Sequence, residues 1–362
     1  MCSKFWPKGG LPGILHHYKE TLVTFEYTAS VTHKPHSIVF LGGLGDGLAT
    51  TSYMSDIVRA LQPTDWSLFT LNLTSSYQSW GLGHLDRDTN EVAECVKYIK
   101  DYKTSKFGDG KIVLMGHSSG SQFVMHYLYR PNPHTGIAPF DPSLEHVKRL
   151  EIDGAIMQAP VSDREVIFLC REMGVGGKTP SEVEAAYQKL EVLAKEADRD
   201  SSCDTLLPLS LTSQIGYLPN VPISSRRFLS LNSPESPLAP EEDDLFSSDI
   251  GDEQLAKTFG MIKERGLLNH KLMVLYSGAD QAVPAYVDKE GLLARWMNAV
   301  NHNGRDQIWD RDHSAVIPGA SHALSNDDQA EPRKDLVRRV LGYLLTAEKV
   351  PTKPTKPTKS SD

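Results

Sequence analysis

Short apolar runs alternate along the chain with longer stretches in which apolar residues recur every three or four positions. Such runs are typical of buried parallel strands, and the longer stretches are typical of amphipathic helices that cover a sheet. We expect strands over residues 21–27, 37–41, 66–73, 111–115, 154–158, 271–276 and 314–317. We expect helices over residues 51–61, 88–102, 122–129, 289–300 and 332–346. The alternation predicts an α/β fold with a mostly parallel central sheet and helices on both faces.

The alternation stops between residues 160 and 266. This stretch holds a charged helical pattern, a Pro/Ser-rich segment and an acidic run over 241–244. We predict that residues 161–266 form a cap or lid with a mobile acidic loop, inserted into a core made of 1–160 and 267–348. Such an insertion overhangs the strand ends, where α/β sheets bind ligands. The alternative is a solvated decoration remote from the site.

The last residues, 349–362, contain three copies of Pro-Thr-Lys. A low-complexity segment of this composition cannot bury a core. We therefore predict a disordered tail and leave it out of the fold.

One segment carries a nucleophile motif. The apolar run 111–115 leads into G-x-S-x-G over residues 116–120, and an apolar helical pattern follows at once. A serine at a sharp strand-to-helix turn has a strained backbone, and small residues two positions away on each side let the strand and helix approach. The motif predicts that Ser118 is the nucleophile of a serine hydrolase. The alternative is a glycine-rich turn with an inert serine.

The serine needs a base that is held by an acid. In hydrolases with this turn, the acid follows the serine in the chain and the histidine comes last. Asp280 lies just beyond the strand expected over 271–276, so we predict it as the acid. Asp163, which follows the preceding strand, and Asp288, near a helix start, are the alternatives.

The base is predicted in the same way. His322 lies in the loop that follows the last expected strand, 314–317, where it can turn back toward the serine. His313 precedes that strand and would lie at the wrong end of it, and His302 is expected at a helix terminus. We therefore predict His322 as the base of the triad.

An ester hydrolase also needs backbone N–H groups that stabilise the developing oxyanion. The residue after the nucleophile, Ser119, is expected to supply one. The glycine-rich loop 42–47 is expected to supply the second from Leu44, with Gly43 as the alternative. This loop matches neither G-x-G-x-x-G nor a P-loop, and no lysine follows its last glycine, which argues against a phosphate site.

Charge and cysteine content exclude several classes of protein. The chain has 38 basic and 46 acidic residues, a net charge of −8, and we expect no nucleic-acid partner. We find no secretory signal and no apolar run of membrane-spanning length, which predicts a soluble, cytoplasmic protein with no membrane partner. The four cysteines lack metal-ligand spacing, and the histidine pairs 16/17 and 33/36 lack carboxylate neighbours, so we predict no metal and no cofactor.

Four segments together resemble a known family. The nucleophile segment 114–122, the glycine loop 42–47, the segment 75–81 and the turn 278–284 are similar to a fungal α/β-hydrolase family long described as of unknown function, which includes an esterase of the siderophore fusarinine C. The resemblance spans the chain except for the tail. It implies an α/β-hydrolase fold and a triad of Ser118, Asp280 and His322.

The same resemblance implies a cytosolic esterase that hydrolyses an imported ferric siderophore, a small-molecule ester whose iron belongs to the substrate. One alternative is a general carboxylesterase or acyltransferase that acts on another small ester. The other is a catalytically silent hydrolase fold that binds a ligand or partner. The sequence leaves the oligomeric state open.

Overall fold

The computed structural model describes residues 6–7, 9–27, 33–134, 141, 144–199 and 205–351. Nearly all of the tail predicted over 349–362 therefore lies outside the described residues. The strands form one sheet in the order β1-β2-β4-β3-β5-β6-β7-β8. They are β1 (Gly13–His17), β2 (Val23–Tyr27), β3 (His36–Leu41), β4 (Trp66–Leu71), β5 (Ile112–His117), β6 (Gly154–Gln158), β7 (Leu272–Ser277) and β8 (Ala315–Ile317).

The sheet is parallel from β4 to β8, and β1 and β2 add an antiparallel edge. Every strand expected from the sequence is present. The structure also contains one strand that was not expected, β1. The sequence analysis missed it because His16 is its one buried residue, and the strand therefore shows no buried apolar run. The predicted α/β fold is thus confirmed.

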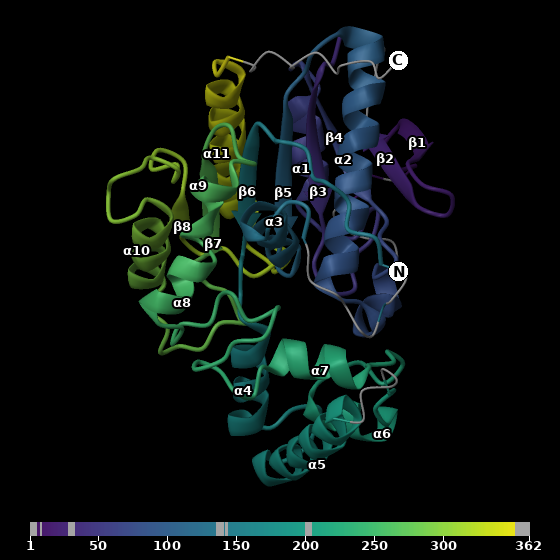
Figure 1. The fold of residues 1–362 in the computed structure, drawn as a ribbon, viewed down its shortest axis with the longest axis vertical. Coiled ribbons are helices and arrows are strands. Elements are labelled where there is room, and N and C mark those ends of the chain that lie inside the picture. Colours follow the sequence, from purple (N-terminus) through teal and green to yellow (C-terminus); the bar gives the residue numbers. More distant parts are fainter. Residues whose placement is uncertain are drawn as a thin grey trace.

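Helices cover both faces of the sheet (Figure 1). On one face, α1 (Met54–Leu61) and α11 (Ala330–Glu348) pack on the inner side chains of β3, β4 and β5. On the other face lie α2 (Leu85–Phe107), α3 (Gly120–Tyr129) and α10 (Lys289–Val300). All five helices were expected, although α2 extends beyond 88–102 at both ends. In the described part of the chain, no helix combines the length and the apolar character needed to cross a membrane.

The predicted insertion divides into two parts that pack differently. Its first helices gather in a lobe beyond one end of the sheet, drawn in teal at the bottom of Figure 1, and share a core of their own with Trp80. These helices are α4 (Asp163–Met173), α5 (Pro180–Arg199), α6 (Leu209–Thr212), η2 (Ser213–Ile215) and α7 (Ser225–Asn232). The later helices, α8 (Asp252–Lys257) and α9 (Met261–Arg265), pack into the main core with α10. The segment with a separate core is therefore shorter than 161–266, and we call α4 to α7 the cap.

The acidic run over 241–244 was expected to form a mobile loop, and two of its four residues are buried. Asp243 and Asp244 are buried. Asp243 pairs with the fully buried Arg227 of α7, and Asp244 pairs with Arg164 of α4 at 2.9 Å. The sequence did not indicate this burial, because the compensating arginines lie elsewhere in the chain, and their charges allow the carboxylates to be buried.

The strand register brings the chemistry-bearing loops to one edge of the sheet. Leu41 at the end of β3 lies opposite Gly116, and His117 at the end of β5 lies opposite Gln158. Ser277 at the end of β7 lies opposite Ile317. Because these strands are parallel, the loops that follow them meet at the same edge.

Candidate active site

Ser118 sits on a tight turn between β5 and α3. Its φ is +52°, in the left-handed region that side chains other than glycine rarely adopt. A Cβ atom at Gly116 would lie 2.2 Å from the carbonyl oxygen of Gly120, and one at Gly120 would lie 2.2 Å from that of Leu41. Both positions therefore require glycine, as the motif predicts, and the strained turn presents the Ser118 hydroxyl at the edge of the sheet.

His322 links the serine to Asp280. Its Nε2 lies 2.9 Å from Ser118 Oγ, and its Nδ1 lies 2.8 Å from Asp280 Oδ2. The Asp280 side chain is fully buried, and its second oxygen accepts a hydrogen bond from the Ala282 N–H at 2.9 Å. Three loops, after β5, β7 and β8, thus supply one continuous hydrogen-bonded chain of the three predicted residues.

The alternative acids have other partners. The Asp163 carboxylate, at the start of α4, accepts a hydrogen bond from Gln122 Nε2 at 2.8 Å. Asp288 caps the N-terminus of α10 by accepting from the Gly291 N–H at 3.0 Å. Since His322 contacts Asp280 and neither alternative, the geometry favours Asp280 as the acid.

The alternative bases also have partners elsewhere. His313 precedes β8, and its Nδ1 lies 3.0 Å from Asp310 Oδ1. His302 follows α10, and its Nδ1 lies 2.8 Å from Asp306 Oδ2. Both positions agree with the reasons for which the sequence analysis set these histidines aside.

The glycine-rich loop after β3 lies directly against the serine. A Cβ atom at Gly43 would approach Ser118 Cβ to 2.8 Å, so only glycine allows this contact. The Gly43 N–H donates to Asp46 Oδ2 at 2.9 Å, which favours Leu44 over Gly43 as the second donor to an oxyanion. Ser119 is the N-cap of α3, so its N–H lies at the positive end of that helix.

A buried polar network supports the histidine loop, and the sequence analysis missed it. The His117 ring packs on the His322 ring with centroids 5.1 Å apart, and its Nδ1 lies 2.5 Å from Gln158 Oε1. Gln158 Nε2 donates to Ser277 Oγ at 3.1 Å and to the His322 carbonyl oxygen at 3.4 Å. Burial, with repulsion from His322, lowers the pKa of His117 to about 4, so this ring is neutral at pH 7.

A second group of polar residues connects the cap to the elements that carry the site. Gln122 of α3 donates both to Asp163 and, at 3.2 Å, to the Asp243 carbonyl oxygen. Burial and the negative charge of Asp243 raise the pKa of Asp163 to about 6. These contacts join α4 of the cap, and the segment that follows α7, to helix α3, which begins at the turn of Ser118.

The short helix η1 (Tyr77–Leu82), which follows β4, contacts the cap. Trp80 is buried in the cap core and packs on Tyr217 with ring centroids 5.5 Å apart. Its carbonyl oxygen accepts from Arg227 Nε at 3.2 Å. A cavity of about 20 Å³, enough for roughly one water molecule, lies between Trp80, Arg227 and the glycine-rich loop. Trp80 is therefore a packed residue at the junction of cap and core.

The chain is similar in sequence to one protein family and to several named proteins. Residues 5–345 match the model of the family described as "Protein of unknown function (DUF1749)". The chain is 68% identical over 350 residues to the fusarinine C esterase sidJ of Aspergillus fumigatus, covering 95% of this chain and 98% of the relative. It is 47% identical to an esterase of Emericella nidulans, covering 94% of each.

A solved structure supports the same placement. The siderophore hydrolase EstB from Aspergillus fumigatus superposes with a TM-score of 0.85 at 66% identity, covering 95% of this chain and all of the other. The fold is also similar to that of a solved structure described as an alpha/beta hydrolase fold protein of unknown function, with a TM-score of 0.52 at 14% identity, covering 93% of this chain and 96% of the other. The chain belongs to the DUF1749 family and is a hydrolase with the α/β-hydrolase fold.

Proposed function

We propose that this hydrolase is a serine esterase that cleaves the ester bonds of hydroxamate siderophores of the fusarinine C type. The observation that carries the proposal is the hydrogen-bonded chain from Asp280 through His322 to Ser118 on a strained strand-to-helix turn. The substrate class follows from the relatives, which are named a fusarinine C esterase and a siderophore hydrolase.

In the first half of the proposed reaction, Ser118 Oγ attacks the ester carbonyl carbon while His322 Nε2 takes its proton. The negative charge that develops on the carbonyl oxygen is stabilised by the N–H groups of Ser119 and Leu44. The protonated His322 then gives the proton to the alcohol oxygen as the ester bond breaks. The buried Asp280 carboxylate keeps the His322 proton on Nδ1 and stabilises the imidazolium.

In the second half, water attacks the acyl-enzyme. His322 takes a proton from that water. The oxyanion of the tetrahedral intermediate accepts hydrogen bonds from the same two N–H groups. When this intermediate breaks down, His322 returns the proton to Ser118 Oγ and the carboxylate product is released. No atom of the protein is consumed, so one triad serves each ester bond of the substrate in turn.

The consequence for iron follows from chelation. Cutting the ester bonds of a cyclic hydroxamate triester converts one hexadentate ligand into separate bidentate arms. The effective concentration that holds each arm on the iron then falls, and the ion is held less tightly. We propose that this releases iron from an imported siderophore, with the iron as part of the substrate.

The cytoplasm is the proposed compartment. Cys95 is buried and Cys170 is partly buried, and both are free thiols. Free thiols are the usual state of cysteines in a reducing compartment. Cys2 and Cys203 lie outside the described residues.

A fluorophosphonate probe tests whether the serine is activated. We expect rapid labelling of the wild-type protein on the peptide that contains Ser118 and no labelling of Ser118→Ala. Ser121→Ala is the matched control, because Ser121 lies one turn away in α3 and is buried. Absence of labelling in the folded wild type would favour the alternative of a silent hydrolase fold.

A panel of esters tests the substrate class separately. The wild-type enzyme is incubated with the ferric fusarinine C triester and, in parallel, with short-chain aryl esters. Conversion of the triester to linear trimer, dimer and monomer supports the proposal. Rapid cleavage of the aryl esters with the siderophore left intact would establish the general carboxylesterase instead.

A further inference from the structure

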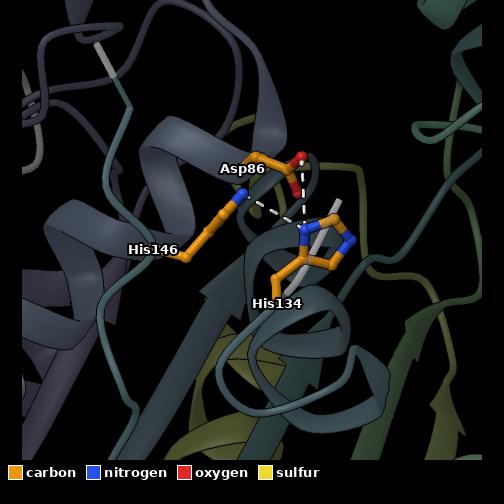
Figure 2. A group of neighbouring side chains, drawn as sticks. All are labelled: Asp86, His134 and His146. Carbon is orange, nitrogen blue, oxygen red and sulfur yellow. Dashed lines mark hydrogen bonds and ion pairs between the residues drawn. The ribbon is translucent and has the colours of Figure 1, made fainter. Parts of the chain in front are cut away.

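A second group of chemically reactive side chains lies apart from the triad. Asp86 belongs to the first turn of α2, His134 lies in the loop after α3, and His146 lies in the segment that leads to β6. Figure 2 shows the three side chains pointing toward one another from these separate segments. One ligand atom from each residue lies within 4.8 Å of the others, and all three residues are partly buried. The sequence analysis predicted no metal from local histidine pairs and did not detect this group.

We propose that Asp86, His134 and His146 bind one divalent transition-metal ion of the Zn²⁺ type. Two imidazole nitrogens and one carboxylate oxygen are ligands that zinc uses in proteins. The proposal goes beyond the esterase function and does not depend on it.

The spacing of the nitrogen atoms fits such an ion. His134 Nδ1 lies 3.3 Å from His146 Nε2. Two nitrogens bound to one tetrahedral Zn²⁺ at about 2.0–2.1 Å are about 3.3 Å apart. Asp86 Oδ2 lies 4.0 Å from His134 Nδ1, and the three ligand atoms lie within 4.8 Å of one another, so the carboxylate must move by a distance on the order of 1 Å to join the two nitrogens.

The charge state of the group also suits a cation. Burial and the positive charge of Arg130 lower the pKa of His134, so its imidazole is neutral at pH 7. Burial alone would raise the pKa of Asp86, but Arg130 and the nearby histidines lower it, so the carboxylate is ionised. Neutral imidazole and ionised carboxylate are the forms that bind metal.

Arg130 is the competitor that an ion must overcome. Its Nη2 lies 3.3 Å from Asp86 Oδ1 and also contacts His134 Nε2. Both contacts lie on the atoms that face away from the proposed ion. When Nδ1 binds metal, the neutral imidazole carries its proton on Nε2, so Arg130 must release that nitrogen while it can keep Asp86 Oδ1. Removal of the guanidinium should therefore strengthen metal binding.

The test is a titration of the full, untagged chain with Zn²⁺ after treatment with a chelator and desalting. We expect one ion per chain, a rise in Tm on binding, and visible absorption of a nitrogen-ligated site when Co²⁺ replaces Zn²⁺. His134→Asn and His146→Asn should each weaken binding by about 100-fold or more, and Arg130→Gln should tighten it by about tenfold.

His302→Asn is the matched control, because His302 also pairs with a carboxylate, Asp306, far from this group in the sequence. It should bind Zn²⁺ as the wild type does. Equal affinity in wild type, His134→Asn and His146→Asn would overturn the proposal, as would the absence of saturable binding in both wild type and Arg130→Gln. The three side chains would then form a hydrogen-bonded network only. If a histidine variant folds poorly by circular dichroism, the Arg130→Gln titration and the Co²⁺ spectrum decide the question.

Discussion

The proposed acid of the triad is tested by a matched pair of substitutions, Asp280→Asn and Asp163→Asn. Asp280 accepts from His322 Nδ1 through one oxygen and from the Ala282 N–H through the other. An amide cannot accept through both of its terminal atoms. If its NH₂ group faces His322, Nδ1 becomes an acceptor and the ring proton moves to Nε2, which can then no longer take the Ser118 proton. We expect kcat to fall by about 10⁴, which corresponds to about 5.5 kcal/mol.

Asp163→Asn is expected to behave differently. The carboxylate bonds Gln122 and not His322, so kcat should stay within about tenfold of wild type. The substitution should instead change how the free energy of unfolding depends on pH. Since the pKa of Asp163 is raised to about 6 in the folded chain, the native state binds more protons than the unfolded state between pH 4 and 6. The wild type therefore loses stability as the pH rises through this window, and the asparagine variant does not.

The size of this effect follows from the shift. A change from 3.8 to about 6 means that the stability of Asp163→Asn relative to wild type should increase by about 2 kcal/mol between pH 4 and pH 8. The assays are the hydrolysis of a chromogenic ester at pH 8 and urea unfolding at both pH values. A loss of activity in Asp163→Asn as large as that in Asp280→Asn would refute the assignment of the acid.

Three further predictions concern the proposed nucleophile and two buried polar groups near the site. Ser118→Ala should lower kcat by about 10⁶, measured with the same chromogenic ester; a folded variant that keeps more than about a tenth of the activity would exclude Ser118 as the nucleophile. Arg227→Leu leaves the buried Asp243 without its cation and should lower the free energy of unfolding in urea by about 3–5 kcal/mol, whereas no change would show that the pair does not hold the cap. Gln158→Leu should lower kcat more than it changes KM, because the loop of His322 loses a donor to its carbonyl oxygen; an unchanged kcat would assign Gln158 to packing alone.

Much of the fold follows from local patterns in the sequence. The strands from β3 to β8 are apolar runs, and the helices over them show the expected periodicity, so both were predicted. The sequence also indicated the three residues of the proposed triad, because a strained turn at Ser118 demands glycines at fixed positions and because Asp280 and His322 follow strands.

The remainder depends on contacts between distant segments. Burial of Asp243 and Asp244 requires Arg227 and Arg164 from other helices, and nothing in the acidic run itself indicates those partners. His16 appeared to have no carboxylate neighbour, yet its Nε2 lies 3.3 Å from Glu26 across the antiparallel edge of the sheet. The prediction for that histidine was wrong because strand pairing, and not sequence spacing, brings the two residues together.

The proposed esterase function is tested most directly by the covalent intermediate. When Ser118 opens a cyclic triester, the alcohol stays attached through the other ester bonds, so the enzyme gains the mass of the whole substrate. Enzyme mixed with the ferric fusarinine C triester, quenched within milliseconds and analysed by mass spectrometry should carry this mass on the peptide that contains Ser118, and linear trimer should follow. Folded Ser118→Ala should give neither adduct nor product. Formation of linear trimer by Ser118→Ala at the wild-type rate would contradict the account.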